Sequence, residues 1–273
     1  MGGVLRELLD IIFSIGGGSF EEQETKTLPA GGYSHLDLRN SNGNIEVEGT
    51  EGEDVIIVAT KKVRARSEEE GRRRLGQLKV VVSEERPELR VYTDVSELRP
   101  KGNWNVNYEV RIPKHMSLSA HTSNGNIKVS DLQGPVQVQT SNGNVEVRRL
   151  GGSVKARTSN GNIRLYEVRE GIEAKTSNGN VYGELLTFGK EERTVLHSSN
   201  GNIELRVPED TSAKVVAGTK NGIVRCELPI SASLQRRNRL EGTIGLGEGE
   251  IELRTTNGNI KISAIGARQG RPK

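Results

Sequence analysis

Residues 123–176 read SNGNIKVSDLQGPVQVQT, SNGNVEVRRLGGSVKART and SNGNIRLYEVREGIEAKT, which are three successive copies of one 18-residue pattern. Each copy opens on Ser-Asn-Gly-Asn and closes on threonine. A short repeat at a fixed interval indicates that one small structural unit is stacked many times. This stretch therefore predicts a repeat architecture, and it names no reaction or ligand.

Each copy contains two short runs in which apolar and polar residues alternate, separated by turn residues. The first run follows Asn-Gly-Asn, as in Ile127-Lys128-Val129, and the second precedes the next Asn-Gly-Asn, as in Val136-Gln137-Val138. Alternation with a period of two is typical of a strand with one buried face. We therefore expect two strands and two bends in each copy.

Two architectures fit this pattern. Asn-Gly between alternating runs is a strong hairpin signal and allows an antiparallel meander. Alternatively, each copy forms one coil of a parallel β-solenoid, in which equivalent side chains stack roughly 4.8 Å apart. Aligned copies repeat the same aliphatic positions, which favours the solenoid. The first expected core column contains Ile127, Val145, Ile163, Val181 and Ile203, and the second contains Val129, Val147, Leu165 and Leu205.

The recurring polar tetrapeptide is expected to form one corner of every coil. Glycine and asparagine tolerate the backbone of tight corners. Stacked amides and threonine hydroxyls are expected to hydrogen-bond to their own copies above and below. The expected asparagine ladder contains Asn42, Asn124, Asn142, Asn160, Asn178, Asn200 and Asn257, and the turn glycines are Gly43, Gly125, Gly143, Gly161, Gly179, Gly201 and Gly258.

The repeat is interrupted in two places. In segment 61–113, Ser67 followed by Glu70 is a capping box that predicts a short helix, and three alternating runs (78–82, 89–92 and 105–112) predict strands. Asn221 and Asn257 lie two periods apart, which predicts one coil without the motif between them. We expect one all-β solenoid domain over 19–265, with 61–113 as an excursion of helix and hairpin, and a flexible basic tail over 266–273.

Residues 1–18 are expected to form an amphipathic helix and a glycine linker. Apolar residues from Val4 to Ile15 recur at helical spacing, and three glycines would end the helix. The helix would cap an open end of the stack or, alternatively, contact a membrane surface or a partner through residues 4–15. The run is too short to span a membrane, and its charges do not fit a signal peptide. We therefore expect a cytoplasmic or membrane-peripheral protein.

Composition excludes several classes of function. Of the 273 residues, 33% are hydrophobic and 3% aromatic, which suits a narrow aliphatic core. The 39 lysines and arginines stand against 36 acidic residues, so no nucleic-acid partner is expected. The single cysteine, Cys226, excludes an intramolecular disulfide.

No group of residues predicts catalysis, a metal site or a cofactor. The glutamates fall at outward strand positions among lysines and arginines, as on a solvated face. The four histidines lack ligand spacing, and no carboxylate recurs in the turn, as a calcium-binding repeat would need. Tyr166 and Tyr182 fall in different columns, so they predict no aromatic platform for a sugar. We predict that the protein is not an enzyme.

The chain resembles a bacterial family called "putative adhesin", domain of unknown function 4097. The features that carry the resemblance are the early single Asn-Gly-Asn copy, the helix-and-hairpin excursion, the strand Val110-Arg111-Ile112-Pro113 and the main array. They cover the chain from about Tyr33 to Ile265. The resemblance implies a β-solenoid, a prokaryotic source and an association with the cell envelope or a stress response. It supplies no catalytic residues.

Three functions follow from these observations. The first is a non-enzymatic interaction or structural scaffold that binds an unknown macromolecule or envelope component along its charge-mixed faces. The second is a self-assembling protein that forms head-to-tail filaments through the open ends of the solenoid. The third is a polysaccharide-cleaving solenoid, which would need an acidic cluster that the sequence lacks.

Overall fold

The computed structural model describes residues 6–10, 18–99 and 101–266. Strands are the main secondary structure of the described residues, which contain one helix, and this confirms the predicted all-β class. The chain divides into two compact units, residues 1–142 and 143–273. The division falls inside an Asn-Gly-Asn turn rather than in a linker, so the single domain expected over 19–265 stays a prediction.

The first unit stacks its coils in parallel across two sheets. β4 pairs with β10 so that Ile45 lies beside Ile127, and β3 pairs with β9 so that Leu36 lies beside Leu118. Like residues therefore lie over like, as the solenoid requires. The strands of these coils are β3 (His35–Arg39), β4 (Ile45–Thr50), β9 (Ser117–His121), β10 (Ile127–Ser130) and β11 (Val136–Gln139).

The excursion extends both sheets of the first unit. β8 and β7 run parallel to β4 and β3, whereas β5, β2 and β6 pair antiparallel to their neighbours. The helix begins at the predicted capping box, where the Ser67 hydroxyl accepts from the Glu70 backbone N–H at 3.2 Å. The excursion starts at Asp54 rather than at residue 61, because the alternation of β5 begins there. These elements are β2 (Ser19–Pro29), β5 (Asp54–Arg64), α1 (Glu68–Gly76), β6 (Lys79–Glu85), β7 (Glu88–Asp94) and β8 (Trp104–Pro113).

The amphipathic helix predicted over residues 4–15 is wrong where the structure describes that segment. Strand β1 (Arg6–Asp10) pairs antiparallel with β2 and places Arg6 beside Thr27. A short isolated helix is marginal in water, whereas the edge of β2 offers a full row of backbone hydrogen-bonding groups. The other residues of the predicted helix and the tail from residue 267 lie outside the described residues, so membrane contact through residues 4–15 stays a prediction.

The second unit repeats the parallel coil with little variation. In one sheet, Val145 lies beside Ile163, Ile163 beside Val181, and Val181 beside Ile203. All nine residues of the two predicted core columns are at most 2% exposed. The parallel strands of this unit are β12 (Val145–Leu150), β13 (Val154–Arg157), β14 (Ile163–Val168), β15 (Ile172–Asn178), β16 (Val181–Leu185), β17 (Arg193–Asn200), β18 (Ile203–Val207), β19 (Ala213–Asn221), β20 (Val224–Cys226), β23 (Gly249–Asn257) and β24 (Ile260–Ala264).

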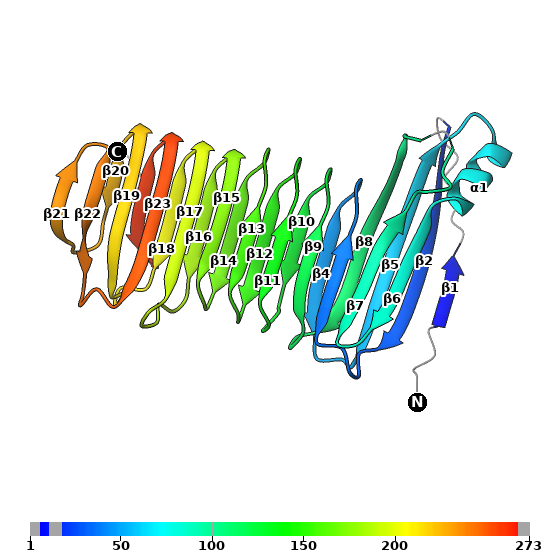
Figure 1. Ribbon diagram of the computed structural model, residues 1–273, viewed down its shortest axis with the longest axis horizontal. Helices are drawn as coiled ribbons and strands as arrows, with labels where there is room; N and C mark the ends of the chain where they lie inside the picture. The colour runs from blue at the N-terminus through cyan, green and yellow to red at the C-terminus, as the bar shows by residue number, and fades with distance from the viewer. Residues whose placement is uncertain (1–5, 11–17, 100, 267–273) are drawn as a thin grey trace. The chain divides into compact units, whose positions relative to one another are not determined.

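The last coil of the sequence is not the last coil of the stack. β23 lies between β17 and β19, and β24 lies between β18 and β20 (Figure 1). The coil predicted between Asn221 and Asn257 is wrong, because that stretch forms a hairpin of β21 (Ser231–Arg236) and β22 (Arg239–Ile244) that pairs antiparallel with β19. The stretch lacks the Asn-Gly-Asn corner that joins one coil to the next, so its alternating runs pair with each other.

Candidate functional site

The predicted asparagines gather along one corner of each unit. In the first unit, the Asn124 amide donates to Asn42 at 2.8 Å, and the Asn142 amide donates to Asn124 at 2.9 Å. In the second unit, each amide likewise donates to the next along the corner, over 2.7 to 2.9 Å, in the order Asn221, Asn257, Asn200, Asn178 and Asn160. Asn221 was not part of the predicted ladder. The amides satisfy one another, so this corner is a structural element rather than a ligand site.

The turn glycines allow the close approach of stacked coils. A Cβ added to Gly161 would lie 2.0 Å from the carbonyl oxygen of Gly143. The buried Thr158 hydroxyl donates to that same carbonyl at 3.0 Å. The expected ladder of hydroxyls is therefore wrong, because each threonine meets a glycine carbonyl of the neighbouring coil before it meets another threonine.

Tyr166 and Tyr182 contact each other although they fall in different columns. Their ring centroids are 5.0 Å apart and the rings are tilted by 41°. Diagonal neighbours on adjacent strands are within reach of aromatic side chains, and the column alignment missed this contact. The guanidinium of Arg148 lies 4.4 Å from the Tyr166 centroid and that of Arg206 lies 5.5 Å from the Tyr182 centroid. The arginines stack on the rings, so the pair offers no flat open platform.

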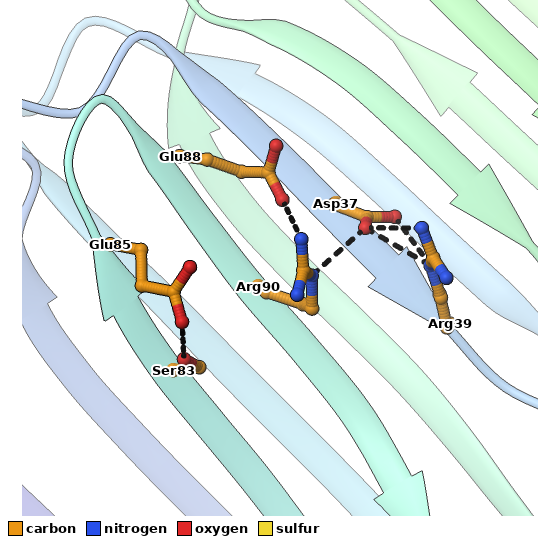
Figure 2. Close-up of polar contacts among 6 residues, drawn as sticks. All are labelled: Asp37, Arg39, Ser83, Glu85, Glu88 and Arg90. Atoms are coloured by element: carbon orange, nitrogen blue, oxygen red, sulfur yellow. Dashed lines mark hydrogen bonds and ion pairs between the residues drawn. The ribbon is translucent and has the colours of Figure 1, made fainter.

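The first candidate surface is a hollow of about 430 Å³ over β7, β3, β9 and β11 of the first unit. At its centre, the Asp37 carboxylate is held by Arg39 Nε at 3.0 Å and Arg90 Nε at 3.3 Å (Figure 2). Arg90 also donates to Glu88 at 2.6 Å. Each arginine of this Asp37 cluster therefore has a carboxylate partner within the cluster, and the charges of the hollow are matched.

The second candidate surface is a groove of about 710 Å³ on the outer face of the second unit, over β15, β17, β23, β19 and the β21–β22 hairpin. We call it the basic groove, because no acidic residue lines it and five lining residues are cationic. These are Lys175, Lys220, Arg236, Arg239 and Arg254.

Only two of these five cations are held by carboxylates. The Arg254 Nε lies 2.8 Å from a Glu252 oxygen, and the Arg239 Nε donates to Glu241 at 2.6 Å. In both cases the acid lies two residues away on the same strand. The other three cations are exposed, and none has an ion-pair partner among the described residues: Lys175, Lys220 and Arg236.

Strand register explains why the cations gather. Lys175 lies beside His197, His197 beside Arg254, Arg254 beside Gly218, and Gly218 beside Arg239. One row of outward positions thus crosses five strands. Gly218 has no side chain, and a Cβ added there would meet no atom within 4 Å. The row is therefore hollowed between its two arginines.

The groove offers positive charge and hydrogen-bond donors. His197 Nε2 lies 3.5 Å from a Glu252 oxygen, and that acid already holds Arg254. Among the described residues, no group of three or more His, Cys, Asp or Glu side chains is placed to hold a metal ion. In the same part of the chain, no helix is long and apolar enough to cross a bilayer.

The sequence contained a signal for part of this groove. Lys175, His197 and Arg254 each stand one residue before the hydroxyl column that opens the corner. Reading that outward column would have revealed a basic row, whereas the net charge averages it with acidic residues elsewhere. The contribution of the hairpin required the structure.

Comparison with known proteins agrees with the predicted family. Residues 136–263 match the family model described as Toastrack DUF4097, which is the family that the Asn-Gly-Asn array resembles. No curated protein sequence matches the chain significantly.

Several solved structures are similar to the chain. One is a putative adhesin from Bacteroides fragilis, with 14% identity, a TM-score of 0.42, and coverage of 89% of this chain and 97% of that one. Another is a putative cell adhesion protein from Clostridium sporogenes, with 9% identity, a TM-score of 0.36, and coverage of 96% and 100%. A third is a putative lipid binding protein from Parabacteroides distasonis, with 13% identity, a TM-score of 0.41, and coverage of 89% and 96%.

Proposed function

We propose that the protein is a non-enzymatic, adhesin-like interaction scaffold of a prokaryotic cell, and that it binds a macromolecule or envelope component through the basic groove. The observation that supports this proposal is the set of three exposed cations without ion-pair partners on one sheet face. All five cations of the groove are carried by hydrogen-bonded strands, which hold side chains more accurately than loops do. A preformed groove of this kind loses less conformational entropy when it binds.

Binding rather than catalysis is proposed because the nearby acids are already engaged. Glycoside cleavage needs two carboxyl groups that face a bond from either side. Glu252 and Glu241, which lie on strands that line the groove, each hold an arginine of their own strand. The groove itself is lined by lysine, arginine, serine, threonine and asparagine side chains together with His197 and small apolar residues.

A depletion assay with isolated bacterial envelope fractions tests the proposal. The full chain is compared with a groove variant, Lys220→Glu/Arg236→Glu, and with a control, Arg164→Glu/Arg225→Glu, on the outer face of the other sheet. We expect the groove variant to lose binding to the fraction and the control to keep it. Equal binding by all three proteins would contradict the assignment of function to the groove.

A second candidate, head-to-tail self-assembly, is favoured by strand β21. Among the described strands β21 pairs with β22 alone, and five of its six residues are exposed. Its free edge presents backbone groups that can pair with another chain. Negative-stain microscopy over a range of concentrations tests this candidate, with Gln235→Pro as the variant that should shorten any filaments. Single particles at every concentration would remove it.

A further inference from the structure

We infer that the basic groove binds a linear acidic polysaccharide that lies across its strands. This inference rests on the proposed function and specifies the class of ligand. Three features of the groove support it: the distance over which its unpaired cations are spread, the side chains that lie between them, and the gap at Gly218.

The unpaired cations are too far apart for one small anion. Lys175 lies on β15 and Lys220 on β19, with β17 and β23 between them. Three strand spacings correspond to roughly 14 Å. Arg236 lies further on, at the end of β21 beyond β22. A ligand that meets all three cations must therefore be extended and carry repeated negative charge.

The lining between the cations favours a polymer rich in hydroxyl groups. Ser199, Thr256 and Asn238 contribute hydroxyl and amide groups to the groove, and no Phe, Tyr or Trp lines it. Proteins that bind single-stranded nucleic acids stack the bases on aromatic side chains, and the groove has none. Hydroxyl and amide groups instead form hydrogen bonds with the hydroxyls of sugars. An acidic polysaccharide matches both the charge and the lining.

Gly218 opens the path of the polymer. It occupies the row between Arg254 and Arg239, and both of these arginines line the groove. Because a Cβ at this position would meet no atom within 4 Å, a longer side chain can be introduced without a clash with the backbone. This position therefore allows a test that changes charge inside the groove while the fold is retained.

The central experiment compares Gly218→Glu with Gly218→Gln in the full chain. Both side chains enter the groove with nearly the same shape, but only glutamate adds a negative charge. The probe is polygalacturonate of defined length, and neutral dextran of equal length is the blank. We expect the Gly218→Glu variant to bind polygalacturonate at least tenfold more weakly than the Gly218→Gln variant, with unchanged melting temperatures for both. Equal affinities of the two variants would overturn the inference.

A second comparison removes the cations themselves. The triple variant Lys175→Ala/Lys220→Ala/Arg236→Ala is matched by Lys128→Ala/Arg164→Ala/Arg225→Ala, which removes three exposed cations from the other sheet. We expect at least a tenfold loss of affinity in the groove triple only, and a weaker dependence of affinity on salt, because fewer counterions are released. Loss of affinity in both triples alike would show that only net charge matters, and would overturn the inference.

Two further arms separate this inference from the proposed function. Single-stranded DNA that binds more tightly than polygalacturonate would assign the groove to nucleic acid and overturn the inference, as would tighter binding to anionic lipid vesicles. If envelope fractions bind through the groove but polygalacturonate does not, the inference fails and the proposed function stands. If neither binds, both fail.

Discussion

The two units differ in whether their charged side chains are paired. In the first unit, each buried carboxylate has two cationic partners: Asp37 contacts Arg39 and Arg90, and Glu24 lies 2.8 Å from Lys26 and 2.6 Å from Lys61. In the described part of the second unit no charged residue is buried, and its exposed groove contains cations without partners. The same coil geometry can therefore carry charges that pair with one another or charges that are exposed to a ligand. The residues at individual positions determine which of the two occurs.

The buried charges of the first unit compensate one another on neighbouring strands. Glu24 and Lys26 lie on β2, near the end of a sheet that the regular coils do not continue. Strand β2 is paired with β1 on one side and with β5 on the other, so these charges lie within the sheet. A buried ion pair adds little net stability, but removing one partner is costly. The buried charges of the first unit therefore depend on one another, whereas the interior of the second unit has no buried charge among the described residues.

The largest expected effect tests the aliphatic interior of the second unit. Ile163→Asp places an unpaired carboxylate in a core column whose residue is fully buried. We expect the free energy of unfolding to fall by about 3–5 kcal/mol, measured by urea denaturation followed by circular dichroism. Arg164→Asp, one residue along and exposed, is the control and should change it by about 0.5 kcal/mol or less. Similar unfolding midpoints for both variants would contradict the inward assignment.

The second prediction compares two glycines of the second unit. Gly161→Ala forces a Cβ against the carbonyl of Gly143, whereas Gly218→Ala extends into open space. We expect the first variant to lose about 1–3 kcal/mol of unfolding free energy through backbone strain. The second should change little. A Gly161→Ala protein as stable as the parent would show that the stacked corner can relax, and would weaken the case for a rigid groove.

The coils could be predicted from the sequence because stacking repeats residue types at visible intervals. Ile163 and Val181 occupy equivalent places in successive copies, and the structure puts them side by side. The order of the coils could not be predicted in the same way. One Asn-Gly-Asn corner can stack on any other, so nothing local shows that the Asn257 coil lies between those of Asn200 and Asn221.

The candidate site was less predictable than the fold. Lys175 and Arg254 lie in one groove only because β23 inserts beside β17, and Arg236 joins them only through a hairpin that the period suggested to be a coil. The helix predicted for the residues of β1 was wrong for a related reason. The apolar residues of this segment have helical spacing, but the segment forms a strand because it pairs with the edge of β2. Pairing between strands far apart in the sequence therefore explains both why the groove forms and why the helix prediction for β1 was wrong.

The third prediction concerns a variant in which the hollow of the first unit gains a cation without a carboxylate partner, as in the basic groove of the second unit. Asp37→Asn keeps the shape of the side chain and removes the charge that holds Arg39 and Arg90. We expect a loss of about 1–3 kcal/mol in unfolding free energy, since a buried charged hydrogen-bond acceptor is weakened. We also expect a gain in polygalacturonate binding over the parent chain. Asp54→Asn, at an exposed position, should produce neither change.

The smallest expected effect concerns acid stability of the first unit. Burial raises the pKa of Glu24, but hydrogen bonds from Lys26 and Lys61 outweigh burial and lower its pKa below the ordinary value. A lowered folded-state pKa means that this stabilisation is complete above the ordinary glutamate range. It is lost as the pH falls through the lowered value. Acidification should therefore lower the unfolding midpoint of the first unit, as reported by the fluorescence of Trp104, the only tryptophan in the chain.

Glu24→Gln isolates this contribution. The variant has no carboxylate to protonate at this position, so its unfolding midpoint should fall less steeply between the ordinary glutamate range and lower pH than that of the parent. At neutral pH the variant should be the less stable of the two, because Lys61 keeps only Glu22, at 3.1 Å, as a carboxylate partner. Identical pH profiles for parent and variant would mean that ionisation of Glu24 contributes no stability to the first unit. The first and second units would then differ in where their charged residues lie, but not in how much Glu24 contributes to stability.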